Sequence, residues 1–322
     1  MLDLLKKILG AETDPYALTI KEATELVVEE SIHKIRLLGG YQKKLRQPVE
    51  TALRHCADLA MKIPGILDIS GNDKTHIELI RCLFDDEDHA RQVVSESPEL
   101  KEFLTRKNVE EVFFLLTMQR QEKSSFGARL QGEMIVRDVL EKAVLFDDFK
   151  VTLPSETIEA AYHSISLALL KVLAHQALEN TLALQQRELE LEKLRDEVEV
   201  KLKIMKHGRQ QVVFDSSDSE SQNPVFESQN LLDEIETELD QVESKTDQRE
   251  FYLNQLTEVL IRPDQYLSVD LIPLKINRLG FFVRERSCDA EGAECIAEFK
   301  SVDGESRSAV LIKCRRDQLE TE

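Results

Sequence analysis

Two long segments of the chain carry apolar residues at helical spacing, and a polar stretch separates them. The first segment runs from about Thr157 to Met205 and the second from about Leu231 to Ile261. Apolar positions that recur at intervals of three and four residues are typical of two helices packed along a narrow seam. The candidate seam consists of Leu184, Leu191, Val198, Leu202 and Met205 in the first segment, and of Ile235, Leu239, Val242, Leu253, Leu256 and Leu260 in the second.

Charges beside the seam favour a hairpin formed within one chain. The end of the first segment is basic and the start of the second is acidic, with Lys201, Lys203, Lys206 and Arg209 in the former and Asp233, Glu234, Glu236, Glu238 and Asp240 in the latter. In an antiparallel hairpin these two ends are neighbours, so opposite charges meet beside the seam. Pairing between chains, including the association of two hairpins, is the alternative that the sequence leaves open.

The polar stretch between the two segments predicts a disordered loop. Residues 208–230 contain the serine-rich, acidic stretch from Phe214 to Pro224, whose composition cannot bury enough apolar surface to order itself. We therefore predict that residues 155–262 form a long antiparallel coiled-coil hairpin with this acidic loop at its tip.

Before residue 150 the apolar pattern predicts helices. Ser97 precedes Pro98 and Asn108 precedes Glu111 by the spacing of a capping box, both of which mark helix starts. The stripe that follows Asn108 predicts a long helix, and its members are Val112, Phe113, Leu116, Phe126, Leu130, Met134 and Leu140. Residues 1–150 are predicted to form one helical domain.

After Pro263 the apolar period changes from helical to alternating. Leu267, Val269 and Leu271 alternate with polar residues, and Asp303-Gly304 lies between two apolar runs as a hairpin turn would. Residues 264–318 are predicted to form a small antiparallel β meander. The fold class is mainly α, and α+β overall: a helical domain, a coiled-coil hairpin and a β module.

Composition and charge narrow the class of partner. The chain of 322 residues has only 11 Gly and 8 Pro, which favours helix, and its formal net charge is −19. A nucleic-acid partner is not expected, because binding phosphates needs a basic face. Residues 215–247 alone hold eleven acidic residues and one lysine, so we expect protein partners, including ones with basic surfaces.

Location is inferred from cysteine usage and hydropathy. Five scattered cysteines do not form a disulfide framework, and no apolar run reaches the roughly 18 to 20 residues of a membrane span, so we expect a cytoplasmic protein without a transmembrane segment. Residues 1–10 are predicted to form a short amphipathic helix, for which docking onto the protein itself and peripheral membrane contact are the two interpretations.

Candidate chemistry is confined to a few acidic and histidine residues. The Glu30-x-x-His33 pair and the weaker Asp86-x-x-His89 pair have the spacing with which helical bundles ligate two metal ions. An ordinary half-buried histidine and an acidic helix start explain the same residues. No phosphate loop, nucleophile elbow or metalloprotease motif occurs, so no cofactor and no catalytic residue are predicted.

The functional hypothesis is a cytoplasmic interaction or scaffold protein. The coiled-coil arm would space or dimerise the two end modules, which makes a homo-oligomer the expected state. The alternative is an enzyme or a ligand- or metal-binding helical domain in residues 16–146, for which the coiled coil serves only assembly.

Overall fold

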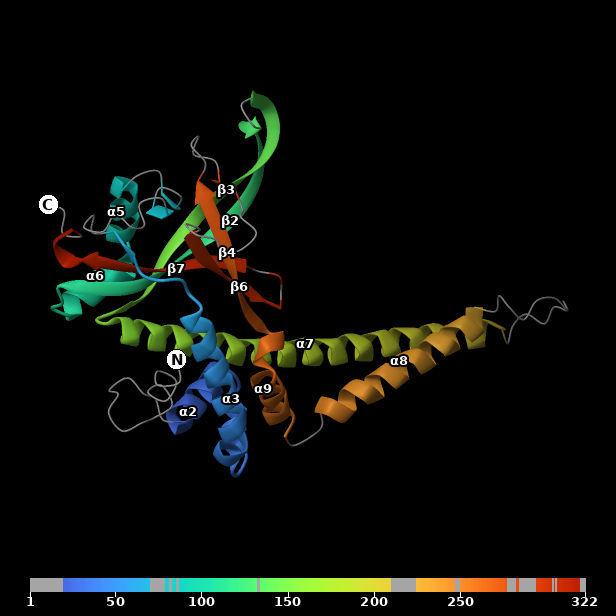
Figure 1. The fold of residues 1–322 in the computed structure, drawn as a ribbon. Helices are drawn as coiled ribbons and strands as arrows, with labels where there is room; N and C mark the ends of the chain where they lie inside the picture. Colours follow the sequence, from blue (N-terminus) through green and yellow to red (C-terminus); the bar gives the residue numbers. More distant parts are fainter. Residues whose placement is uncertain are drawn as a thin grey trace.

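The computed structural model describes an α+β body from which a helical hairpin projects (Figure 1). It describes residues 20–69, 79–80, 83–84, 87–131, 134–209, 224–246, 250–276, 282–283, 294–302, 304 and 306–318. Residues 1–10, Asp86 and most of the predicted acidic loop therefore lie outside the described residues.

One mainly antiparallel sheet forms the centre of the body. Its strands are β1 (Leu67–Asp68), β2 (Glu111–Gln131), β3 (Met134–Ser155), β4 (Leu267–Ile276), β5 (Phe282–Val283), β6 (Glu294–Ser301) and β7 (Ser306–Arg315). The order across the sheet is β3-β2-β7-β6-β4-β5. β2 lies along one edge of β7, while β6 and the short parallel β1 share the other edge.

Helices cover both faces of this sheet. On one face lie α2 (Ile20–Glu30), η1 (His33–Leu37), α3 (Tyr41–Met61), the first half of α7 (Ile158–Arg209) and α9 (Phe251–Ile261), which share one core with inward residues of the sheet. On the other face lie α5 (Glu87–Ser95) and α6 (Pro98–Arg106), packed in a second core. Two further short turns, η3 (Pro263–Gln265) and η4 (Arg316–Gln318), flank β4 and β7.

The two cores explain why strand β2 is apolar at consecutive positions. Phe114, Leu116 and Met118 belong to the core under α5 and α6, while Leu115 belongs to the core under α7. A strand buried on both faces does not show alternating hydrophobicity. The predicted long helix after Asn108 is therefore wrong: residues 111–155 form two strands, and the region 1–150 is not all helical.

The predicted β strands after Pro263 are confirmed, but they are not a separate sheet. β4, β6 and β7 form an antiparallel meander, and β7 continues the sheet by pairing Glu111–Met118 of β2. The strands in residues 111–155 and those in residues 267–315 thus form one sheet together. A strand pair or meander of this size is marginal alone, and the joint sheet with helices on both faces supplies the missing burial.

Strands β2 and β3 extend beyond the sheet as a two-stranded ribbon. β7 pairs with β2 only as far as Met118, whereas β2 and β3 remain paired from Gln119↔Asp147 to Gln131↔Met134 (Figure 1). At each of its three register shifts β3 holds one residue more than β2. Two of these bulges contain the described non-glycine residues with positive φ, Asp148 at 48° and Leu153 at 56°.

Helix α7 belongs to both the body and the projecting hairpin. It has 52 residues, and Thr157 caps its start by accepting a hydrogen bond from the Ala160 amide at 3.2 Å. In its first half Ile165, Leu170 and Leu173 are buried between the sheet and the helices α2, α3 and α9. This agrees with the apolar face of this half, which is wider than the face that packing against a single neighbouring helix would bury.

The second half of α7 leaves the body and pairs with α8 (Pro224–Thr246), which returns along it (Figure 1). The expected hairpin within one chain is present. Its second helix starts at Pro224 and not near Leu231, because proline is favoured in the first turn, where its missing amide donor costs nothing.

The predicted second segment is two helices. α8 ends at Thr246 and α9 begins at Phe251, with Glu250 in a non-helical conformation before it. Leu253, Leu256 and Leu260 are buried in the core with α3 and α7, so they do not extend the hairpin seam. Their spacing could not reveal this, because a core-facing helix repeats its apolar residues at the same interval.

Candidate functional site: the helical arm and its attachment

The arm, which we define as residues 186–209 of α7 with α8, has a buried seam of its own. Its members are Leu191, Val198 and Leu202 of α7 and Ile235, Leu239 and Val242 of α8, with Leu232 packed against them. Leu184 and Met205, the remaining candidate positions on α7, are half-buried. This cluster is separate from both cores of the body, so the arm is held together by its own side chains.

An ion pair fixes the register of the arm close to the body. The guanidinium of Arg187 donates to the Glu238 carboxylate from Nε at 2.9 Å and from Nη2 at 2.7 Å. Near the tip, the basic residues of α7 were predicted to meet acidic residues of α8. Lys203 instead pairs with Glu199 of its own helix at 3.2 Å. The acidic face of α8, defined as exposed Asp233, Glu234, Glu236 and Asp240, is turned outward beside the seam.

A tyrosine on α9 joins the root of the arm to the body. The Tyr252 hydroxyl accepts hydrogen bonds at 3.3 Å from both Lys34 Nζ of η1 and Gln185 Nε2 of α7. The Lys34 ammonium also lies 5.3 Å from the centre of the tyrosine ring, a cation–π distance. Lys171 of α7 pairs with Glu30 at the end of α2 at 2.6 Å. These contacts fix the direction in which α7 leaves the body.

The sheet carries a buried charge pair at the point where the ribbon begins. Arg120 Nε donates to Glu298 Oε1 at 2.8 Å, and Arg120 Nη1 to Glu122 at 2.7 Å. Burial alone would lower the pKa of Arg120, but hydrogen bonds and charges from Glu298 and Glu122 outweigh it and raise that pKa. Lys300 continues the row towards Asp270, which it contacts at 2.7 Å. No local pattern predicts this pair, because its partners lie 178 residues apart.

The metal-ligand candidates are dispersed. Glu30 is engaged by Lys171, and His33 lies on the 3-10 turn η1, exposed, with Nδ1 at 3.7 Å from Glu29. His89 is on the opposite side of the sheet, on α5, edge-on to the rings of Phe84 and Phe149. Among the described residues, no group of three or more His, Cys, Asp and Glu side chains is placed to hold a metal ion.

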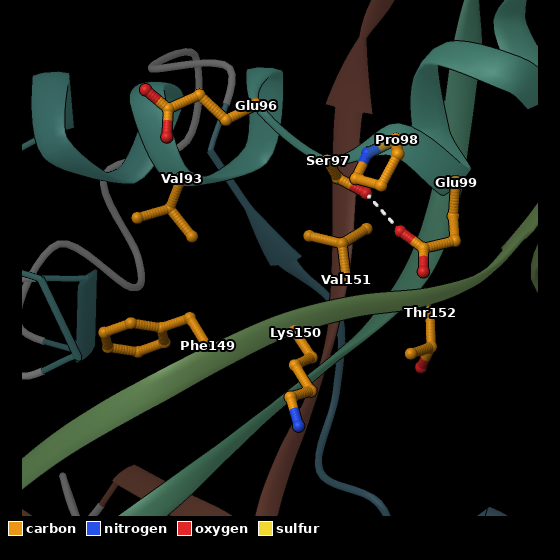
Figure 2. A pocket seen from close by; sticks show the side chains of 9 residues that line it. All are labelled: Val93, Glu96, Ser97, Pro98, Glu99, Phe149, Lys150, Val151 and Thr152. Carbon is orange, nitrogen blue, oxygen red and sulfur yellow. Dashed lines mark hydrogen bonds between the residues drawn. The ribbon is translucent and has the colours of Figure 1, made fainter.

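A shallow cleft of about 520 Å³ opens between the α5–α6 junction and β3 (Figure 2). Val93, Phe149 and Val151 face its interior, whereas Lys150 points away from the helices. The Ser97 hydroxyl at its rim is already engaged: it accepts from the Leu100 amide at 3.3 Å and donates to Glu99 at 3.1 Å. These contacts are those of a helix cap, so the structure accounts for the polar groups without a ligand.

The described cysteines are of two kinds. Cys56 and Cys314 are free and buried, and burial raises the pKa of each thiol to about 12. Cys295 is disulfide-bonded. The thiolate is the reactive form, so Cys56 and Cys314 are structural residues and not nucleophiles.

None of the helices in the described part of the chain is both long and apolar enough to cross a membrane. Comparisons with protein-family models, with curated proteins and with solved structures found no match to this chain.

Proposed function

We propose that this protein is an interaction or scaffold protein whose helical arm, a coiled-coil hairpin, holds a protein partner with a basic surface. The observation that carries the proposal is the structure of α7, which is fixed in the body by its first half and carries the arm on its second half (Figure 1). The hairpin has a seam of its own and projects from the folded body. Its exposed surface is therefore available to a partner and is not required to bury the core of the body.

The charge of the arm supports a partner with a basic surface. The acidic face of α8 is exposed, and the chain as a whole has a formal charge of −19. Complementary charge accelerates encounter and excludes partners of like charge, while adding little to affinity at an exposed rim. A basic protein surface is therefore favoured over an acidic one, and nucleic acid is disfavoured.

Charge reversal on the arm tests this proposal in the full-length chain. The variant Asp233→Lys, Glu234→Lys, Asp240→Lys changes three exposed residues of α8 without touching the seam. A matched control reverses three exposed acids of the body, Asp58→Lys, Glu258→Lys, Asp264→Lys, and so has the same net charge.

The readout is quantitative affinity purification from the native cell with both variants and the unchanged chain. We expect a set of basic proteins to be retained by the unchanged chain and the body control and lost from the arm variant. The proposal is wrong if the arm variant retains the same partners as the control.

A further inference from the structure

Helix α7 has a second row of apolar residues, which begins just before the arm and continues along it on the side that α8 does not cover. Leu182, Leu189, Val200 and Ile204 are 54%, 53%, 54% and 67% exposed. We call these four residues the outer stripe. Apolar residues scattered singly on a surface need no explanation, but a row along one face of a projecting helix indicates contact with another chain.

The spacing places the outer stripe on one face of the helix. The intervals between its four members are close to whole numbers of helical turns, so at about 100° per residue they fall within a sector of roughly 60°. By the same geometry the sector is centred opposite the seam residues Leu191, Val198 and Leu202, which face α8. Another helix can therefore contact the outer stripe without displacing α8.

Two charges divide the outer stripe in the middle. Lys193 and Asp196 lie on the same face between Leu189 and Val200, and both are exposed. Asp196 has its carboxylate 3.3 Å from the guanidinium of Arg195, and 71% of its side chain is accessible. Polar Gln186 also lies on this face, between Leu182 and Leu189, so the row has apolar residues towards both ends and a pair of opposite charges in the middle.

This arrangement is complementary to itself in one orientation only. If a second α7 runs antiparallel, Leu189 meets Val200 and Lys193 meets Asp196, and the two-fold axis repeats both contacts. If it runs parallel in register, Lys193 meets Lys193 and Asp196 meets Asp196, which is repulsive. We propose that two copies of this chain associate antiparallel through their outer stripes, forming a four-helix bundle from two arms.

The shape of the molecule permits this pairing. From Leu182 to Ile204 the helix is about 33 Å long, and two helices in contact over that length bury on the order of 1,000 Å² in total, at the lower end of specific interfaces. The antiparallel arrangement places the two bodies at opposite ends of the paired arms. The acidic faces of α8 remain on the outside, and the association goes beyond the proposed function without depending on it.

The oligomeric state of the full-length chain tests the proposal. Sedimentation equilibrium over about 1 to 100 µM should give a mass rising towards twice 36.9 kDa. Leu189→Glu should weaken association tenfold or more, because it places a charge in the centre of the apolar contact. Leu37→Glu, at a leucine that is 86% exposed on η1, is the matched control and should leave the mass unchanged.

The charges test the orientation. Lys193→Glu and Asp196→Lys should each weaken association about three- to tenfold, since each creates two like-charge contacts per dimer. The double variant Lys193→Glu, Asp196→Lys should recover the original affinity. In a parallel dimer the single changes would have no such effect, because like charges already face each other.

A monomer at every concentration overturns the proposal, as does a dimer that is unaffected by Leu189→Glu. A dimer without the single-and-double pattern refutes the antiparallel register. Mass is measured on the purified chain alone, so these outcomes are independent of whether the arm retains a basic partner.

Discussion

Arg187 and Glu238 pair across the arm, with the guanidinium donating twice to one carboxylate oxygen at 2.7 and 2.9 Å. They are 51 residues apart in the chain, and the pair lies at the point where α7 leaves the body. It therefore defines the register in which α8 returns along α7. One seam residue on each side, Leu191 and Leu239, lies within a turn or so of the pair, so an error in register would misplace both.

We expect Arg187→Glu to destabilise the arm slightly and Arg187→Glu with Glu238→Arg to recover the loss. Both side chains are about half exposed, and such pairs contribute roughly 0.2 to 1 kcal/mol. A double-mutant cycle by urea unfolding measures the coupling. Additive single effects would show that the pair does not fix the register.

Truncating the seam should cost much more. Leu191→Ala removes a side chain that is 1% exposed, and loss of a buried leucine costs about 2 to 5 kcal/mol. The same change at Leu194, which is 41% exposed, should cost less than about 1 kcal/mol. Amide hydrogen exchange of α8 provides the readout, since opening of the arm exposes α8 without unfolding the body. Equal protection in the two variants would contradict the hairpin.

Glu298→Ala should be among the most damaging single changes in the sheet. It leaves the Arg120 guanidinium, which is 16% exposed, with Glu122 as its remaining partner, and losing a charged hydrogen bond at a partly buried site costs about 1 to 3 kcal/mol. The double variant Arg120→Met, Glu298→Leu should recover most of the stability, because no unpaired charge remains. Glu122→Ala, at a more exposed partner of the same arginine, is the control and should cost less than about 1 kcal/mol. The quantity compared is the free energy of unfolding in urea.

The buried thiols predict a loss of stability in alkali. The pKa of Cys56 rises from its ordinary value of 9.0 to about 12 because the thiol is buried. Above pH 9 the unfolded chain releases this proton while the folded chain keeps it, so stability falls as the pH rises from 9 to 12. The slope for one thiol is about 1.4 kcal/mol per pH unit.

Unfolding free energies of the unchanged chain and Cys56→Ala, measured between pH 9 and 11, isolate this contribution. Lysines and tyrosines titrate in both proteins, so the difference in slope belongs to Cys56. Identical slopes would mean that the thiol ionises as easily in the folded chain as in the unfolded one.

The sequence predicts the arm well because its information is local. Each helix of the arm has one apolar face and one partner, so the interval between Leu191 and Val198, or between Ile235 and Leu239, identifies the buried side. The helix start at Ser97 was recognisable for the same reason, because the cap and its amide partner lie three residues apart.

The sheet was harder to predict because the strands that pair in it are far apart in the sequence. Phe113 is half-buried against one core and Phe114 is fully buried in the other. Strand β7, which holds β2 in the sheet, lies almost two hundred residues further along the chain. The pairing of Arg120 with Glu298 has the same origin. A helical reading of Val112, Phe113 and Leu116 satisfied the local pattern, and only the pairing of β2 with β7 contradicts it.

The outer stripe could be located in the sequence but not interpreted from it. Its residues and their helical phase are present in the sequence, but they become informative only when α8 is known to occupy the opposite face. A helix with two apolar rows could equally lie between two neighbours in a core, as the first half of α7 does.

Because α7 is continuous, the arm and the body are joined by one unbroken helix. A helix of 52 residues is about 78 Å long, and the described chain has no break between the side chains buried in the body and those at the tip of the arm. A straight helix cannot swivel about its own middle without losing backbone hydrogen bonds. A displacement of the arm at Leu202 therefore moves the helix at Leu173, which packs on the sheet. The direction of the arm and the packing of the body are coupled through α7.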